Sequence, residues 1–405
     1  MMNRYDVVVI GGGPIGAVTA RSAATFGARV LLVERSASTD DPSPCTGLVS
    51  PRTLPALGVT ESSVVRRIRS IDAYAPGGRR LTLTSAAVKG LVLDRASLRA
   101  ELHARARDAG ATILLGREAI DVRPGSIDLR STTSTERLEA RVIVIATGLA
   151  TALPQRLSLP TPVRLFRAVQ AVIDREPERP DAVSTYFGAR IAPEFFGWAV
   201  PAEPGRMRVG LAVSPDLDPV PFLESLLESC APGTAVRSRL LGRVAIGPVS
   251  EPFGDGLLLV GDAAGQVKPL TGGGLYTGAI CARIAGRTAA SAAASRKTER
   301  KDLCTYAADC DRAIGDEIRF GLAARDLLES LSDEGIDDAF AAADHPDLLR
   351  FLGVNGDIDR LRRLPRRLAA EPALWKRLLP LLSLLDRHLA SRASRAVAPP
   401  AKDSL

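Results

Sequence analysis

Residues 5–34 contain the pattern that most restricts how this chain folds. The apolar run YDVVVI is typical of a buried parallel strand and leads directly into GGGPIG at residues 11–16. Glycines at 11, 13 and 16 permit a sharp turn, close approach of the backbone to a pyrophosphate, and tight packing of helix on strand. A second strand over residues 28–33 ends at Glu34, whose carboxylate can accept hydrogen bonds from ribose hydroxyls. The unit predicts binding of a dinucleotide without a 2′-phosphate, so NADP is not expected here.

A second glycine-rich segment, GDAAGQVKPLTGGGLY, spans residues 261–276. It follows the apolar run LLLV, so Asp262 is predicted at the end of a buried strand that enters a tight glycine turn. Gly272, Gly273 and Gly274 then open a small-residue helix over residues 277–294. Bare N–H groups at the positive end of that helix suit the electron-rich edge of a cofactor.

Three segments between these motifs carry further candidate residues. The loop at residues 36–51 contains PCTG, where Cys45 is either a buried thiol in a turn or a residue close to a cofactor's reactive face. A helix is predicted to begin at LDR, residues 93–95, where Arg95 opposes the helix dipole. Arg95 therefore either contacts a phosphate or carbonyl or is solvated. The buried strand RVIVI at residues 141–145 ends in ATG.

The strand patterns predict an α/β fold with two domains and a helical end. Residues 70–92 and 163–213 alternate apolar and polar, as antiparallel strands do, and FFGWAVP forms a hairpin in which Trp198 is either a core residue or the wall of a ligand pocket. A Rossmann-like domain, a parallel sheet flanked by helices, is assigned to residues 1–70, 90–162 and 240–295. An inserted antiparallel-sheet domain that binds substrate takes 71–89 and 163–239, and a C-terminal helical region takes 296–392.

Composition excludes several classes of protein. Of the 405 residues 46% are hydrophobic and 24% charged, as in soluble enzymes, and a net charge of +7 selects no partner. The five cysteines form no CxxC pair, which argues against a metal site or a disulfide framework and favours the cytoplasm. The sequence contains no recognisable signal peptide, membrane-spanning run or nucleic-acid-binding pattern.

The C-terminal hundred residues carry weaker signals. The segment at residues 374–389 places leucines on one helical face after an arginine cluster at 362–367, so it either docks on its own domain or lies peripherally on a membrane. Residues 393–405 are expected to form a disordered tail. The histidines His103, His345 and His388 are predicted in helices away from the motifs, so none is an obvious general acid.

The separated motifs together resemble the geranylgeranyl reductase family, within the FAD-containing hydroxylase-like superfamily with its glutathione-reductase-type nucleotide fold. The resemblance covers residues 5–290 and rests on GGGPIG with Glu34, PCTG at 44–47, LDR at 93–95, FGWAVP at 196–201 and GDAAGQVKPLTGGG at 261–274. Phe196 and Val200 stand where the family usually has tyrosine and phenylalanine. The resemblance implies FAD as cofactor and a hydrophobic, polyprenyl-type substrate.

The resemblance also implies roles for individual residues. The pyrophosphate of FAD would contact Gly11, Gly13 and Gly16. Its adenosine end would contact Glu34, Arg35 and the backbone of Ala119, and Arg95 would lie along the cofactor. Asp262 would hold the ribityl chain or pyrophosphate, and Gly272, Gly273 and Gly274 would stabilise negative charge on reduced flavin. Cys45 and Thr46 would approach the flavin ring, and Trp198 would line the substrate cavity; Cys45 and Trp198 are the catalytic candidates. Other cofactor-binding candidates are Pro14, Ile15, Gly47, Thr147, Gly148 and Gly261.

The implied activity is reduction of carbon–carbon double bonds by hydride from reduced flavin, with the proton supplied by water or Cys45. NAD(P)H would dock transiently as electron donor, since the sequence contains no second GxGxxG. Two alternatives stay open. One is a flavin-dependent monooxygenase or a halogenase, although halogenases typically have two tryptophans in the element that here contains only Trp198. The other is a non-catalytic flavin-binding or electron-transfer protein, and the sequence does not indicate an oligomeric state.

Overall fold

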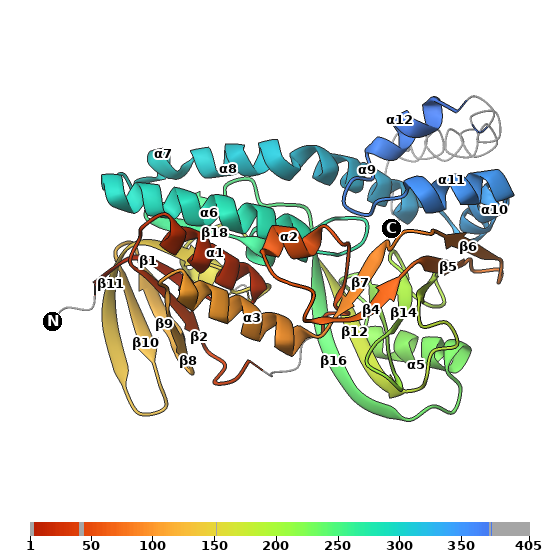
Figure 1. Cartoon of the computed structure of the whole chain (residues 1–405), viewed down its shortest axis with the longest axis horizontal. Coiled ribbons are helices and arrows are strands. Elements are labelled where there is room, and N and C mark those ends of the chain that lie inside the picture. Colours follow the sequence, from red (N-terminus) through yellow and green to blue (C-terminus); the bar gives the residue numbers. More distant parts are fainter. Residues whose placement is uncertain (1–3, 40–43, 151, 372–373, 375–405) are drawn as a thin grey trace, which may run out of the picture.

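The computed structural model describes residues 4–39, 44–150, 152–371 and 374. A parallel sheet with its helices and an antiparallel sheet lie side by side, and helices from the C-terminal half of the chain run along both (Figure 1). This arrangement confirms the predicted α/β class.

The first sheet has the order β17-β18-β11-β1-β2-β8, in which only the edge strand β17 is antiparallel to its neighbour. Two more strands, β9 and β10, join β11 in an antiparallel meander. The strands are β1 (Arg4–Ile10), β2 (Val30–Glu34), β8 (Thr112–Leu115), β9 (Glu118–Arg123), β10 (Ser126–Arg130), β11 (Thr135–Ile145), β17 (Phe253–Gly254) and β18 (Leu257–Leu259).

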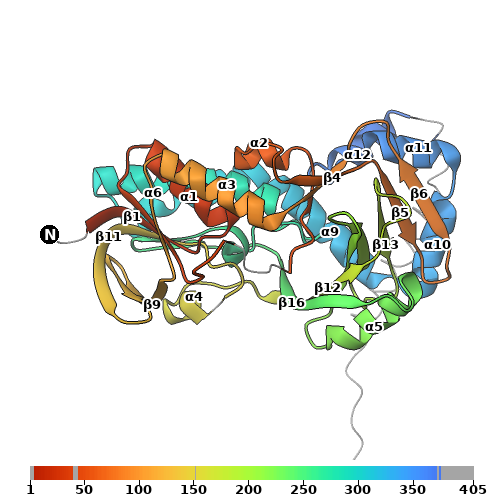
Figure 2. The same cartoon turned by 60° about the horizontal axis from the view of Figure 1, so that its bottom comes forward.

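Helices cover one face of this sheet, and the β9–β10–β11 meander covers the other (Figures 1 and 2). Small residues allow the helices to pack closely: a Cβ on Gly286 would lie 2.6 Å from the carbonyl oxygen of Thr19. The helices of this layer are α1 (Pro14–Thr25), α2 (Thr53–Leu57), α3 (Arg95–Asp108) and α6 (Leu275–Ser295), and α4 (Ala152–Arg156) follows β11.

The second sheet has the order β16-β12-β15-β14-β13-β5-β6 and is antiparallel except for the β13–β5 pair. Helix α5 (Pro219–Cys230) packs on one face of it. A small sheet of β3 (Leu48–Val49), β7 (Gly90–Leu93) and β4 (Val64–Ile68) lies next to its other face. The strands of the seven-stranded antiparallel sheet are β5 (Ser70–Tyr74), β6 (Arg80–Thr84), β12 (Arg164–Asp174), β13 (Ala182–Tyr186), β14 (Gly197–Pro201), β15 (Arg206–Val213) and β16 (Val236–Ile246).

The rest of the described chain is helical, and α10 and α11 reach the β5–β6 end of the second sheet (Figure 2). In the described ranges no helix combines the length and the apolar run that crossing a bilayer requires. The helices are α7 (Arg300–Leu303), α8 (Thr305–Cys310), α9 (Asp316–Ser330), α10 (Asp333–Ala343), α11 (Pro346–Asn355) and α12 (Arg363–Ala369), with a π-helical turn at Asp311–Gly315 before α9.

The observed elements differ from the sequence predictions in three places. Gly261–Ala264 forms a 3-10 helix instead of a simple turn, and β11 begins six residues before the predicted run at 141 because its outer half pairs with β10. Strand β16 lies wholly in the antiparallel sheet, whereas the predicted domain boundary at residue 240 would divide it. Apart from Leu374, the leucine-rich segment and the tail lie outside the described residues, so membrane contact stays a prediction.

Candidate functional site

The GGGPIG loop needs glycine at two positions for steric reasons. Gly11 has a φ of +107°, and a Cβ there would lie 2.4 Å from the carbonyl oxygen of Ala146. A Cβ on Gly16 would lie 1.8 Å from the carbonyl oxygen of Gly11. At Gly13, by contrast, a Cβ would meet nothing within 4 Å, so its backbone faces open space. The loop therefore offers one bare backbone surface at the start of α1, as a pyrophosphate requires.

The end of β2 places Glu34 against this loop. Its Oε2 accepts a hydrogen bond from the N–H of Gly12 at 2.6 Å, and its Oε1 accepts one from Ser36 at 2.9 Å. Arg35 is exposed beside it. The carbonyl oxygen of Glu34 accepts from Arg117, so the chain leading into β9 and Ala119 starts next to this carboxylate.

His103 corrects a sequence prediction. It is buried on α3, and its Nε2 lies 2.7 Å from the carbonyl oxygen of Gly12, so it contacts the first motif directly. Burial lowers the pKa of His103. A carbonyl requires a donor, so Nε2 carries the proton, and Nδ1 is buried with no hydrogen-bond partner in the described part of the chain. His103 positions the loop in its neutral form. His345 caps α11, and His388 lies outside the described residues.

Arg95 begins α3, whose N-terminus is capped by the Asp94 side chain. Its Nε and Nη1 are buried and have no hydrogen-bond partner among the described residues. Its charge acts on Asp262: burial raises the pKa of that carboxyl, and the charge of Arg95 partly opposes the rise. Buried guanidinium donors without partners are costly unless an anion takes them. The anionic pyrophosphate group of a dinucleotide cofactor fits this position.

Ile15 joins the two glycine-rich motifs. Its side chain lies 2.9 Å from the position of a Cβ on Gly261, which has a φ of +69°, and 2.8 Å from one on Gly278. A Cβ on Gly274, the N-terminal cap of α6, would lie 2.6 Å from Oδ1 of Asp262. The two glycine-rich segments therefore pack directly against each other, and Asp262 lies beside Gly274 in the second.

A buried network of hydrogen bonds holds the start of the second glycine-rich motif in place. Gly261 donates to Oε1 of Gln266 at 2.8 Å, and Nε2 of Gln266 donates to the hydroxyl of Tyr306 at 2.9 Å. That hydroxyl donates in turn to the carbonyl oxygen of Leu259 at 2.8 Å. Gln266 and Tyr306 are positioning residues that sequence reasoning missed, because each is an unremarkable polar residue until the fold pairs them.

The PCTG loop is held by the antiparallel sheet. Arg208 on β15 is buried, and its Nη1 donates to the carbonyl oxygen of Thr46 at 2.6 Å, while its Nη2 pairs with Glu203 at 2.6 Å. Gly47 has a φ of +70°, and a Cβ there would lie 2.5 Å from the carbonyl oxygen of Leu93, so the turn requires glycine. Cys45 precedes it, and its Sγ accepts the N–H of Gly47 at 3.5 Å.

Trp198 lies on the same face of the antiparallel sheet as Arg208. Its Nε1 donates to Oε1 of Gln170 at 3.2 Å, and its ring lies over Gly210, where a Cβ would be 2.8 Å from two ring carbons. Phe196 contacts Trp198 edge-on at 6.1 Å and stacks on Phe195 at 4.8 Å. The Phe195 ring ends 3.5 Å from the position of a Cβ on Gly272. Aromatic rings thus extend from Trp198 to the second motif.

Arg325 links the aromatic segment around Phe195 to the second glycine-rich motif through hydrogen bonds. It is fully buried on α9 and donates to the carbonyl oxygens of Pro269 and Glu194, at 2.7 and 2.6 Å. Its guanidinium carbon also lies 4.1 Å from the centre of the Phe195 ring. The C-terminal helices therefore help to build the site.

Comparison with known proteins identifies the family. Residues 5–174 match the pyridine nucleotide-disulphide oxidoreductase family. A digeranylgeranylglycerophospholipid reductase of Methanothermobacter thermautotrophicus is 34% identical over 360 residues, which cover 85% of this chain and 93% of that protein. The chain belongs to the geranylgeranyl reductase family. Members of this family are FAD-dependent oxidoreductases, and the open face at Gly13 and the unpaired donors of Arg95 fit that cofactor.

Solved structures share the fold of this geranylgeranyl reductase family member. A geranylgeranyl bacteriochlorophyll reductase-like protein from Thermoplasma acidophilum superposes with a TM-score of 0.81 at 22% identity, covering 93% of this chain and 99% of that one. A p-nitrophenol 4-monooxygenase from Pseudomonas putida gives 0.70 at 17%, covering 90% and 98%. The fold alone therefore does not separate reduction from oxygenation.

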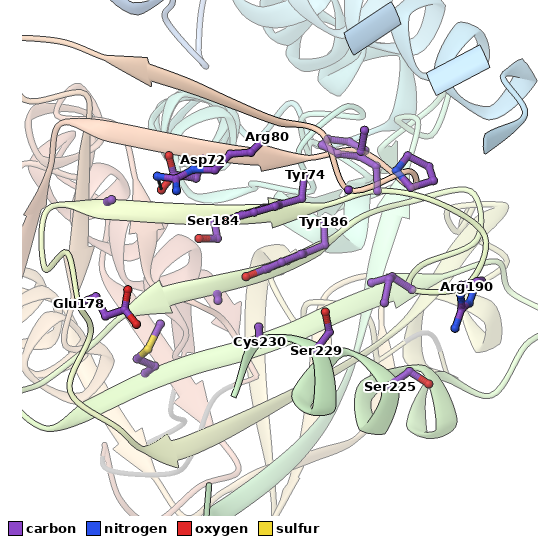
Figure 3. Close-up of a pocket in the computed structure, with 18 of the residues that line it drawn as sticks. Asp72, Tyr74, Arg80, Glu178, Ser184, Tyr186, Arg190, Ser225, Ser229 and Cys230 are labelled. Carbon is purple, nitrogen blue, oxygen red and sulfur yellow. Dashed lines mark ion pairs between the residues drawn. The ribbon is translucent and has the colours of Figure 1, made fainter. Parts of the chain in front are cut away.

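This geranylgeranyl reductase family member also has a separate cavity of about 620 Å³, on the face of the antiparallel sheet opposite to Trp198. In Figure 3, Tyr74 and Tyr186 project side by side from neighbouring strands, opposite Ser225, Ser229 and Cys230 of α5. The two tyrosine rings stack at 4.9 Å. Because strand residues alternate between faces, Trp198 and Arg208 point away from this cavity. It contains none of the predicted site residues.

Proposed function

We propose that this chain uses FAD to reduce carbon–carbon double bonds of an isoprenoid lipid, on the sheet face that carries Trp198. The aromatic path from Gly272 carries the proposal. It passes through Phe195, Phe196 and Trp198, with successive ring centres 4.8 Å and 6.1 Å apart. Apart from Phe195 these rings are half-buried, so they can present apolar surface to a long unsaturated chain.

The name of the Methanothermobacter relative supports this substrate class, since that protein is a digeranylgeranylglycerophospholipid reductase. The family element has Phe196 and Val200 here, and Val200 is buried while Phe196 faces the aromatic path. Neither side chain adds a hydrogen-bonding group to the wall. Apolar side chains at these two positions suit a hydrocarbon chain.

We assign the cofactor contacts as follows. The bare backbone at Gly13 binds the pyrophosphate, with Arg95 as its charge partner, and Glu34 binds the adenosine ribose. Asp262 binds hydroxyl groups of the cofactor's chain, and the N–H groups at Gly273 and Gly274 face its electron-rich edge. The remaining cofactor-contact assignments are those to Gly11, Pro14, Ile15, Gly16, Arg35, Cys45, Thr46, Gly47, Ala119, Thr147, Gly148, Gly261 and Gly272.

When bound, FAD supplies the hydride chemistry that reduces a double bond. The chain's part is to orient the lipid along the aromatic path, exclude water from it, and provide a proton for the neighbouring carbon. We assign that proton to Cys45, or to a water beside it, because Arg208 fixes the loop that carries this thiol. A reduced nicotinamide, docking transiently, is the proposed electron donor.

Anaerobic turnover tests the proposal. Protein loaded with FAD and reduced with dithionite is mixed with digeranylgeranylglycerophospholipid, and mass spectrometry should detect products heavier by about 2 Da for each reduced bond. Replacement W198A should lower kcat/KM on this lipid by about tenfold to a hundredfold, because it removes a large apolar contact. Replacement Y74A, in the cavity on the opposite face, should leave kcat/KM unchanged.

The outcomes separate the alternatives. Product that forms only with oxygen, carrying an added oxygen atom, would identify a monooxygenase. FAD that binds and is reduced, yet transfers nothing to any polyprenyl lipid, would favour an electron-transfer protein.

A further inference from the structure

A buried ion pair connects the second glycine-rich motif to the C-terminal region. Nζ of Lys268 lies 2.5 Å from Oδ1 of Asp359, although the two residues are 91 positions apart. The Asp359 side chain is fully buried, and that of Lys268 is 13% exposed. The hydroxyl of Ser50, just after the PCTG loop and β3, donates to the other oxygen of Asp359. Three distant segments therefore meet at one carboxylate.

The backbone fixes the position of the Lys268 charge. The N–H of Lys268 donates to the carbonyl oxygen of Gly273 at 3.2 Å, and the N–H of Gly272 donates to that of Lys268 at 2.9 Å. The side chain folds back over the same turn, because a Cβ on Gly273 would lie 3.1 Å from its Cε and 3.5 Å from its Nζ. The ammonium is thus held beside Gly273, at the positive end of α6.

Asp359 is itself held in place. Its N–H donates to Oδ1 of Asp357 at 3.0 Å, in the turn between α11 and α12. Asp357 also pairs with Arg52 at 3.0 Å, so this turn is tied to the chain segment that follows Ser50. These contacts hold the backbone at Asp359, and the Ser50 hydroxyl holds its carboxylate beside Lys268.

We propose that Asp359 is a positioning residue that holds the Lys268 ammonium at the flavin loop, and that this pair sets the electrostatic potential at bound FAD. The proposal rests on the assignment of FAD to this loop. Within the pair the two charges largely cancel, so neither dominates the field. Removing either one leaves the other uncompensated in a site of low polarity, where a charge acts strongly on its surroundings.

Because the two charges are opposite, their removal should act in opposite directions. Without Asp359 the lone ammonium favours electron density on the flavin, and without Lys268 the lone carboxylate opposes it. A role limited to packing would instead shift both variants the same way, since each loses the same contact. The sign of the change therefore distinguishes electrostatic positioning from structural support.

Sulfite titration of the oxidised, FAD-loaded protein measures this sign, because adduct formation puts negative charge on the flavin. We expect D359N to lower the sulfite Kd by about tenfold and K268M to raise it by about tenfold. The double variant K268M/D359N should lie within about twofold of the wild type, because it restores neutrality. The matched control S50A removes a hydrogen bond but no charge, so it should change the sulfite Kd by less than about threefold.

Shifts of both single variants in the same direction, or no shift in either with FAD still bound, would overturn the proposal. Should one single variant fail to fold, its partner and the double variant still carry the comparison. Wild-type protein that does not take up FAD would contradict the cofactor assignment instead, and that outcome is seen before any sulfite is added.

Discussion

Arg208 and Thr46 are 162 residues apart in sequence, yet the Arg208 guanidinium donates to the Thr46 carbonyl oxygen at 2.6 Å. This contact joins β15 of the antiparallel sheet to the loop that carries Cys45. It holds together the sheet proposed to bind the substrate and the loop proposed to contact the cofactor, and both must be in place for a reaction between these ligands.

We therefore expect R208M to affect stability and catalysis together. Loss of its charge-assisted hydrogen bonds to Thr46, Leu93 and Glu203 should reduce the free energy of unfolding by about 2–3 kcal/mol. Urea unfolding monitored by circular dichroism measures this loss, and steady-state kinetics should give a lower kcat. Arg206 on the same strand is 40% exposed, and R206M should cost less than about 1 kcal/mol. Equal effects of both replacements would contradict this role for Arg208.

Arg95 should matter for the cofactor and not for the folded apoprotein. Its Nε and Nη1 have no protein partner in the described chain, so R95M should leave the unfolding midpoint of the apoprotein unchanged or slightly raised. The Kd for FAD should rise by about tenfold to a hundredfold, because a charge-assisted contact to a phosphate is lost. Fluorescence titration with FAD measures it. The comparison variant is R99M, one helical turn further along α3, which should bind FAD normally.

Gly274 and Gly273 form a matched pair for testing the second motif. In G274A the new methyl would meet Oδ1 of Asp262 at 2.6 Å, whereas in G273A it would meet Cε of the Lys268 side chain at 3.1 Å. We expect G274A to displace the carboxylate and weaken FAD binding by about 1–3 kcal/mol. G273A should have a smaller effect, because the methyl would be 0.5 Å further from its nearest neighbour and would not meet Asp262. Isothermal titration with FAD ranks the two, and a stronger effect of G273A would contradict the steric account.

His103 predicts a pH dependence of the apoprotein. Burial lowers its pKa below the ordinary value of 6.5, so in acid the unfolded chain binds a proton that the folded chain does not. This contribution to stability is complete above pH 6.5 and is lost as the pH falls below it. H103Q keeps a donor to Gly12 but does not titrate, so its melting temperature should fall less between pH 7 and pH 5. Parallel melting curves of the two proteins over this range would contradict the assignment.

Much of the cofactor loop could be predicted because its requirements are local. Gly11 and Gly261 have positive φ, and Gly16 and Gly274 leave no room for a Cβ. Each requirement fixes a glycine at one position of a short sequence motif. Apolar runs and alternation likewise located most strands, since burial on one or both faces leaves a period in the sequence. Gly261–Ala264 forms a 3-10 helix and not the predicted turn, because both structures favour the same residue types.

The residues that assemble the site carried no such signal. His103 was predicted away from the motifs, and Arg208, Arg325, Tyr306 and Asp359 were not predicted at all. Each acts through a partner between 40 and 162 residues away. A hydrogen bond across that separation constrains neither residue's neighbours in the chain, so no spacing or periodicity reveals it. The amino-acid sequence alone determined the glycine positions and the hydrophobic periods, because both depend on local backbone geometry. The charges that hold the loops together became visible once the chain had folded and buried them.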